Sequence, residues 1–194
     1  MENKKKLNRV GIMGGTFNPI HLGHLVTASE ALNQFGLDKI IFIPSGIPPH
    51  KDDVKKASAE HRYLMSVIAV ASNENFFVSR IEIDSQEISY TIDTLKKLKD
   101  LYGTRTELFF ITGADAILEI LTWKKPHEVI KMCSFIAATR PGYDLSKLKG
   151  LMEDLFKEDK GLASKKIFVV DIPALAISST DIRLRVKEGR SIDY

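Results

Sequence analysis

The sequence predicts one α/β domain in which helices cover both faces of a parallel sheet. Short apolar runs alternate with longer amphipathic segments along the 194 residues, and this alternation is typical of strands that are each followed by a returning helix. The length is enough for one complete hydrophobic core. We see no internal repeat, low-complexity tract or linker, so the domain is expected to span residues 1–194, with residues 1–8 as a flexible basic tail.

The first half of the chain is expected to hold three strands and three helices. Apolar residues recur at steps of three and four in the first helix. Ser58 is placed to cap the second helix, and residues 44–57 before it, rich in Pro, Gly and charge, are expected to form a loop. The predicted elements are strand 10–13, helix 22–35, strand 39–43, helix 58–71, strand 76–83 and helix 91–101.

The second half repeats the pattern and completes a doubly wound, Rossmann-like sheet. Residues 107–111 (ELFFI) are predicted as a strand, and a short helix follows Gly113. Strand 135–138 ends at a turn over 140–142, and helix 145–156 and strand 166–170 come next. Ser178 or Ser179 is placed to cap a final helix that runs through Val186.

The composition excludes several classes of protein. The formal net charge is only +3, and the basic residues form no stripe of the kind that binds nucleic acid. No run of 18 apolar residues could cross a membrane, and the start of the chain does not resemble a signal peptide. Cys133 is the only cysteine, so no intrachain disulfide can form. We therefore expect a cytoplasmic protein with no nucleic-acid or membrane partner.

The most informative segment follows the first predicted strand, from Gly14 to His24 (GGTFNPIHLGH). The two glycines allow the backbone to approach a ligand closely, and the start of the next helix offers free N–H groups to a phosphate. His21 and His24 place two imidazoles on one side of that helix, and Gly23 leaves space there for a bulky anion. We interpret the segment as a phosphate-binding turn. A pair of metal ligands is the alternative, although no third ligand has an obvious spacing.

A second candidate anion site lies at the start of the last predicted helix, from Ser178 to Arg183 (SSTDIR). The hydroxyl groups can cap the helix and, together with its free amides, hold a phosphate. Arg183 lies one turn further and can reach the same anion with its planar guanidinium. Taken alone, such a segment is more often a structural cap. Together with the paired histidines, it favours a second contact to the same ligand.

These two segments, HLGH and ISSTDIR, resemble the signature motifs of the nucleotidylyltransferase superfamily. The resemblance implies the nucleotidylyltransferase type of sheet and attack by a substrate phosphate on the α-phosphate of ATP. It makes His21, His24 and Arg183 the catalytic candidates, since their donors can neutralise charge in the transition state. It also implies Mg²⁺ as a cofactor that is bound mainly through the ATP phosphates. The ATP-binding residues that it implies are Gly14, Gly15, Thr16, Phe17, His21, His24, Gly113, Asp115, Arg140, Ser178, Ser179, Thr180 and Arg183.

Further segments are similar to the bacterial nicotinate mononucleotide adenylyltransferase family, and the similarity runs from about residue 9 to residue 194. They are PPHK at 48–51, SYTIDTL at 89–95, GAD at 113–115, TW at 122–123 and RPG at 140–142. The resemblance implies a pyridine ring beside Trp123 and a carboxylate near the amides that begin helix 91–101, a helix that Ser89 or Thr91 is expected to cap. The substrate-binding residues that it implies are His50, Lys51, Ser89, Tyr90, Thr91, Trp123 and Lys124.

The expected activity is an adenylyl transfer in NAD biosynthesis. The resemblance implies that ATP and nicotinate mononucleotide are converted into nicotinate adenine dinucleotide and pyrophosphate. Nicotinamide mononucleotide and pantetheine phosphate are alternative acceptors, because they present a similar phosphate. A non-catalytic nucleotide sensor on the same fold is the alternative from a different class. The sequence leaves a homo-oligomer open.

Overall fold

The computed structural model describes residues 8–49, 56–139, 144–155, 166–173 and 175–193, and these form one six-stranded sheet. The strand order is β3-β2-β1-β4-β5-β6, and every neighbouring pair is parallel. The strands are β1 (Asn8–Gly15), β2 (Lys39–Pro44), β3 (Phe76–Val78), β4 (Thr106–Gly113), β5 (Ser134–Thr139) and β6 (Ile167–Asp171). Because β1 and β4 are neighbours, the winding reverses between them. The predicted doubly wound, Rossmann-like class is confirmed.

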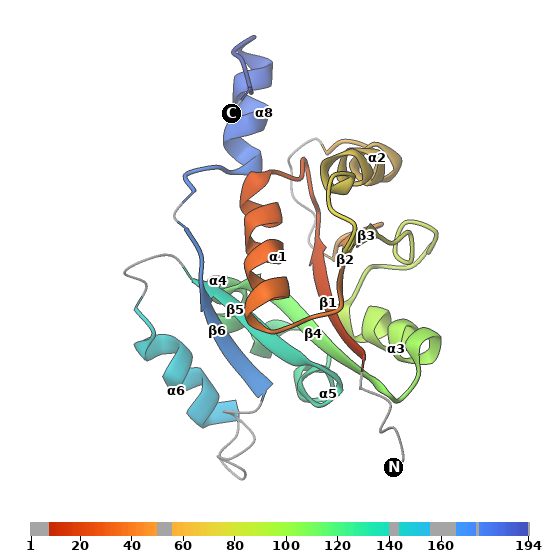
Figure 1. The fold of residues 1–194 in the computed structure, drawn as a ribbon, viewed down its shortest axis with the longest axis vertical. Helices are drawn as coiled ribbons and strands as arrows, with labels where there is room; N and C mark the ends of the chain where they lie inside the picture. Colours follow the sequence, from red (N-terminus) through yellow and green to blue (C-terminus); the bar gives the residue numbers. More distant parts are fainter. Residues whose placement is uncertain (1–7, 50–55, 140–143, 156–165, 174, 194) are drawn as a thin grey trace.

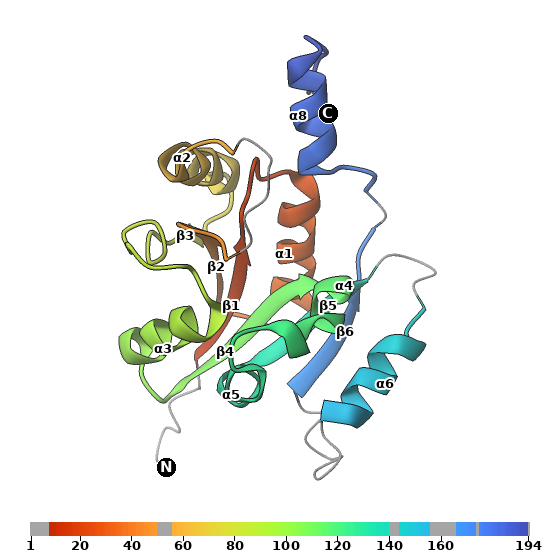
Figure 2. The same cartoon turned by 180° about the vertical axis from the view of Figure 1, so that it is seen from behind.

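Helices cover both faces of this sheet. Figure 1 shows α1 in front of the sheet, and Figure 2, which is drawn from behind, shows α3, α4 and α5 on the opposite face. The helices are α1 (Leu22–Gln34), α2 (Ala59–Val70), α3 (Thr91–Tyr102), α4 (Ala114–Leu118), α5 (Pro126–Met132), α6 (Ser146–Leu155) and α8 (Ser179–Lys187), and a short 3-10 helix, η1, spans Ile120–Thr122.

The alternation of side chains along the strands divides the hydrophobic core into two clusters. Ile12 of β1 belongs to the cluster under α3, α4 and α5, whereas the next residue, Met13, belongs to the cluster under α1 and α2. This is the two-residue period of a strand whose two faces are both covered. Each fully buried Leu or Ile stabilises the fold by about 1.5–3 kcal/mol relative to an exposed side chain.

Two predictions about elements were wrong, and one helix was missed. Strand 76–83 stops at Val78, because the chain then turns, with the Asp84 N–H donating to the Arg80 carbonyl at 2.9 Å. Helix α5 was not predicted; it has 7 residues, begins at Pro126 and is too short to show helical periodicity. Asn8 was assigned to the basic tail but pairs with Thr106 in the sheet. Residues 1–7 lie outside the described part of the chain.

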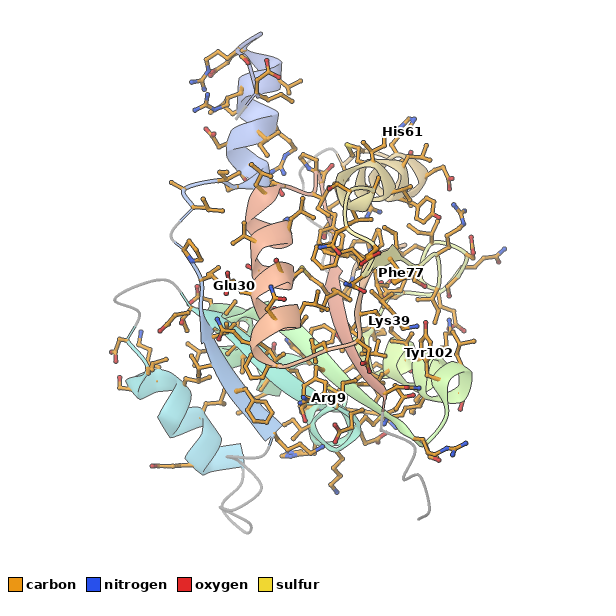
Figure 3. All side chains as sticks on the ribbon, viewed as in Figure 1. Arg9, Glu30, Lys39, His61, Phe77 and Tyr102 are labelled. Atoms are coloured by element: carbon orange, nitrogen blue, oxygen red, sulfur yellow. The ribbon has the colours of Figure 1, made fainter. Side chains whose placement is uncertain are left out.

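The amino end of the sheet carries a contact between a lysine and two aromatic rings, whereas the carboxyl end carries the turn into α1. At the amino end of β2, the Lys39 ammonium lies 4.4 Å from the ring centroid of Tyr102 and 5.8 Å from that of Phe77 (Figure 3). At the carboxyl end of β1, the chain turns into α1, and α8 lies beyond the start of α1 in both views (Figures 1 and 2). No helix of the described residues is long and apolar enough to cross a lipid bilayer.

Candidate active site

Two cavities open at the carboxyl ends of β1 and β4, where the winding of the sheet reverses. One has a volume of about 350 Å³ and the other about 520 Å³. Both are lined by Gly14 of β1 and Thr112 of β4, so they are neighbours on either side of these two strands. Ligands of open parallel sheets bind at such a reversal. The 520 Å³ cavity, called the larger cavity below, is lined by His24, Gly113 and Asp115. The 350 Å³ cavity, called the smaller cavity, is lined by Trp123.

The two predicted histidines stack on each other at the start of α1. His21 is the residue before the helix and His24 is the third residue within it. Their ring centroids are 3.8 Å apart, and the ring planes differ by 31°. The backbone N–H of His21 donates to Nδ1 of His24 at 3.2 Å. Since Nδ1 is the acceptor, the neutral imidazole of His24 carries its proton on Nε2 and presents one N–H donor.

Burial keeps both imidazoles uncharged. It lowers the pKa of His24 to about 3, with the neighbouring His21 as the second cause, and it also lowers the pKa of His21. Neutral rings can donate hydrogen bonds to phosphate oxygens but bring no positive charge. Nδ1 of His21 is buried and has no hydrogen-bond partner among the described residues, which costs free energy until a partner arrives.

Gly23 lies against the His21 imidazole. A Cβ atom at this position would lie 3.0 Å from Cε1 and Nδ1 of His21. The space that Gly23 leaves is therefore occupied by the His21 imidazole, and the binding of an anion there stays a prediction. His21 does not line the cavity that contains His24. It lines a third cavity, of about 480 Å³, together with residues of α2 and α8.

The start of α8 is fastened to the loop that precedes His21. The Ser179 hydroxyl donates to the Pro19 carbonyl at 2.7 Å, and Nη1 of Arg183 donates to the Asn18 carbonyl at 2.8 Å. Nη2 of Arg183 donates to the Thr180 hydroxyl at 3.1 Å. The Asn18 and Arg183 positions are 165 residues apart in the sequence. The structure therefore brings Ser179, Thr180 and Arg183 to the same turn as the histidines.

The remaining residues of the two anion motifs have distinct positions. Ser178 is the N-cap of α8 and accepts a hydrogen bond from the Asp181 N–H at 3.1 Å, as predicted. Gly15 and Thr16 line the smaller cavity. Phe17 is only 3% exposed, so its side chain belongs to the core and only its backbone could meet ATP. Its φ of 47° lies in a region that residues other than glycine rarely adopt, and such strain gathers at functional turns.

A small cavity of about 150 Å³ adjoins the smaller of the two main cavities. It is lined by Ser89, Tyr90, Thr91, Trp123 and Lys124, together with Pro49 and Thr122. Five of the predicted substrate-binding residues therefore lie around one opening. Nζ of Lys124 is 2.9 Å from the Asp93 carboxylate and 4.3 Å from the centroid of the Tyr90 ring. The half-buried Trp123 ring packs edge-on against Phe110, with 5.7 Å between the centroids.

The start of α3 is not capped as the sequence predicts. Its N-cap residue is Tyr90, and the helix start has no side-chain cap from any of the described residues. The Ser89 hydroxyl instead accepts from the Gly46 N–H at 3.2 Å. Thr91 is the first residue of the helix and lines the same small cavity. The Asp93 and Thr94 N–H groups donate to the Tyr90 carbonyl at 3.0 and 3.1 Å. An outside acceptor would therefore meet the amides of Thr91 and Ile92, with the partial positive charge of a helix N-terminus.

Three of the predicted site residues cannot be placed, and three residues at the smaller cavity were not predicted. His50, Lys51 and Arg140 lie outside the described residues. Sequence reasoning missed Glu82 and Thr94 in the smaller cavity, and it missed the buried Arg62 beside it. The Thr94 hydroxyl donates to the Glu82 carboxylate at 2.6 Å, and burial raises the pKa of Glu82. Glu82 lay on a predicted strand and Arg62 on an amphipathic helix, so neither carried a signal of function.

The fold and these cavities define a nucleotidyltransferase, and comparison with known proteins agrees. A family model described as cytidylyltransferase-like matches residues 12–185. Proteins named probable nicotinate-nucleotide adenylyltransferase are 55% identical in Thermoanaerobacter sp. (strain X514) and 54% identical in Moorella thermoacetica. Each alignment covers 96% of this chain, and 86% and 84% of those proteins. The chain belongs to the nicotinate-nucleotide adenylyltransferase family.

A solved structure shares the fold. The Plasmodium falciparum nicotinic acid mononucleotide adenylyltransferase, complexed with NaAD, superposes with a TM-score of 0.72. The superposition covers 95% of this chain and 87% of that one, at 23% sequence identity. At this identity the likeness concerns the fold alone.

Proposed function

We propose that this protein transfers the adenylyl group of ATP to nicotinate mononucleotide, which yields nicotinate adenine dinucleotide and pyrophosphate. This is the reaction that the names of its relatives describe, and we place it in NAD biosynthesis in the cytoplasm. One observation carries the proposal: two cavities share Gly14 and Thr112, one containing His24 and the other Trp123. A triphosphate on one side and a pyridine nucleotide on the other would meet over the end of β1.

The chemistry needs alignment and charge neutralisation. In the proposed arrangement the acceptor phosphate attacks the α-phosphate in line, and pyrophosphate leaves from the opposite side. Nε2–H of His24 donates to an oxygen of the reacting phosphate, where it stabilises the charge that develops. His21 supplies a second imidazole, and Ser179 and Arg183 contact the leaving phosphates from the start of α8. One such preorganised donor contributes about 3 kcal/mol to transition-state stabilisation.

The residues present fit a Mg²⁺ ion that arrives with ATP. Among the described residues, no group of three or more His, Cys, Asp and Glu side chains is close enough to form a dedicated metal site. The larger cavity offers the exposed carboxylate of Asp115 and the neutral imidazole of His24. Mg²⁺ is commonly held by substrate phosphates, water and one or two carboxylates, and when bound it would neutralise phosphate charge. Gly14 and the start of α1 would then contact the remaining phosphate oxygens.

A preference for the acid form of the acceptor has a physical basis at α3. Helix α3 starts at Thr91, which lines the same small cavity as Trp123, and the helix start has no side-chain cap from the described residues. Nicotinate carries a carboxylate that can accept from these amides, whereas the amide of nicotinamide has no negative charge. A site built to pair with one group discriminates strongly against an analogue that leaves its donors unpaired.

The test compares three acceptors with the purified protein, ATP and Mg²⁺. We expect kcat/KM for nicotinate mononucleotide to exceed that for nicotinamide mononucleotide by about tenfold or more, and pantetheine phosphate to give background rates. Pyrophosphate release is measured, and the product is identified by mass spectrometry. Equal rates for acid and amide would reject the carboxylate site. ATP binding without pyrophosphate release with any acceptor would favour a nucleotide sensor.

A further inference from the structure

The most buried charged side chain of the described residues is the guanidinium of Arg62 on α2. The residue is only 2% exposed. Nη1 donates to the Thr16 carbonyl at 2.7 Å, Nε to the Ala57 carbonyl at 3.2 Å and Nη2 to the Gly46 carbonyl at 3.3 Å. All three nitrogens of the guanidinium therefore contact backbone, and they contact it in three different segments: the β1–α1 loop, the segment after β2 and the residue before the cap of α2.

The burial of this guanidinium carries a desolvation cost that hydrogen bonds to carbonyls must offset. A buried guanidinium loses hydration and destabilises the fold unless its donors are satisfied. Within the described part of the chain, no carboxylate forms an ion pair with Arg62. Burial lowers the pKa of Arg62, and the Glu82 carboxylate, acting through space, opposes this shift in part. The planar fork of Arg can hold several carbonyls at fixed angles, which a flexible ammonium cannot do. The side chain is thus suited to holding loops in place.

Two of the three segments that Arg62 joins line the smaller cavity. Thr16 lines this cavity directly, and so do Ser45 and Pro48 on either side of Gly46. The Ser45 N–H and hydroxyl both donate to the Gly15 carbonyl, at 2.9 and 3.1 Å. Arg62 therefore reinforces a junction between the glycine turn and the segment after β2.

Hydrogen bonds also tie the segments of Gly46 and Ala57, both held by Arg62, to other parts of the chain. The Gly46 N–H donates to the Ser89 hydroxyl, and the Ala57 N–H donates to Oδ1 of Asn18 at 3.1 Å. Asn18 is the residue whose carbonyl accepts from Arg183. Arg62 donates to none of the residues that line the larger cavity with His24. Its influence is therefore directed at the smaller cavity.

We infer that Arg62 is a positioning residue that fixes the wall of the acceptor cavity, so that it affects the KM for the mononucleotide more strongly than the KM for ATP. The inference rests on the proposed function, which assigns the smaller cavity to the acceptor. Arg62 contacts neither substrate in this account. It acts through the carbonyls of Thr16, Gly46 and Ala57, because a binding surface that is already held in place loses less free energy to ordering when the mononucleotide binds.

The test compares Arg62→Lys with Arg80→Lys as a matched control. Arg80 is exposed, and its guanidinium contacts the carboxylates of Glu60 and Asp84, away from both cavities. We expect Arg62→Lys to raise the KM for nicotinate mononucleotide about tenfold or more and to leave the KM for ATP within about twofold, whereas Arg80→Lys leaves both unchanged. A merely structural role would lower the amount of active enzyme, and so kcat, without changing either KM. That outcome would overturn the inference.

A second variant and a second readout keep the inference separate from the proposed function. Gly46→Ala places a Cβ 2.1 Å from the Glu82 carbonyl oxygen, so the backbone at Gly46 or at Glu82 must shift, and this disturbance of the same wall should raise the same KM. Hydrogen exchange of the unliganded protein needs no substrate. Arg62→Lys should speed exchange in peptides that contain Gly46 and Ala57, and Arg80→Lys should not. Unchanged exchange would reject the positioning role, whereas wild-type protein that releases no pyrophosphate would reject only the proposed function.

Discussion

Replacing His24 by alanine removes one defined donor, together with the acceptor of the His21 N–H and the ring contacts with His21 and Phe17. His24 is held by the N–H of His21 on Nδ1, so Nε2–H is the only donor that the ring offers to a ligand. Alanine is the best helix former, and the bond from the Thr27 hydroxyl to the Gly23 carbonyl, at 2.8 Å, does not involve the imidazole. Helix α1 should therefore form in the variant, and the loss should be confined to the site.

The expected loss follows from the value of one preorganised donor. Removing such a donor raises the activation barrier by about 3 kcal/mol, and about 1.36 kcal/mol corresponds to a factor of ten in rate. The kcat of His24→Ala should therefore fall about 10²-fold or more. The KM for ATP should change less, because the contact is stronger in the transition state than in the ground state.

Steady-state pyrophosphate release at saturating ATP and nicotinate mononucleotide measures this loss, with circular dichroism to verify the fold. His61→Ala is the matched control, because His61 is an exposed residue of α2 whose backbone N–H, not its ring, bonds to Ser58 (Figure 3). The low pKa of His24, about 3, adds a second criterion: the pH profile of the wild-type kcat/KM, which reports the free enzyme, should show no titration of this ring between about pH 5 and 8. Near wild-type turnover by His24→Ala would refute the reasoning.

Three further predictions concern stability and the two substrates. The folded-state pKa of His24, about 3, is below its ordinary value of 6.5, so the unfolded chain binds more protons than the folded chain between these two values. The free energy of unfolding, measured with urea, should therefore fall as the pH drops from 6.5 towards 3. His24→Ala should flatten this slope, and an unchanged slope would contradict the buried neutral ring. Trp123→Ala should raise the KM for nicotinate mononucleotide about tenfold, because a stacked aromatic contact is worth about 1–3 kcal/mol, while the KM for ATP stays constant; equal changes in both would remove Trp123 from the acceptor site. Arg183→Lys loses the fork that reaches Asn18 and Thr180, and titration with a non-hydrolysable ATP analogue should show binding weakened about tenfold; unchanged affinity would place the triphosphate elsewhere.

Elements with strong local signals could be predicted from the sequence. Ser58 accepts from the His61 N–H and begins α2 as expected, and Ser178 does the same for α8. Strand 76–83 was predicted too long because its alternation of apolar residues continues past Val78, although the chain has already left the sheet. Helix α5 was missed since its 7 residues are fewer than two full helical repeats of the apolar pattern. Local pattern thus determines where elements exist better than where they end.

The candidate site was predictable where it depends on residue type and not where it depends on backbone contacts. Two imidazoles three residues apart, and hydroxyls before an arginine, are chemical patterns that a sequence shows directly. The contact between Arg183 and the Asn18 carbonyl joins positions 165 residues apart, so only the fold reveals it. Arg62 bonds to three backbone carbonyls, and every residue has a carbonyl, so its partners leave no trace in the sequence. The uncapped start of α3 is likewise a property of geometry.

The central claim is that groups from the first turn and from α8 hold one triphosphate. A crystal structure with a non-hydrolysable ATP analogue tests it most directly. We expect Nε2 of His24 and the Ser179 or Arg183 side chain to lie within hydrogen-bond distance of oxygens of the same triphosphate chain, with the nucleoside in the cavity of Gly113 and Asp115. A triphosphate bound away from His24, or one that contacts His24 but not the start of α8, would contradict the account.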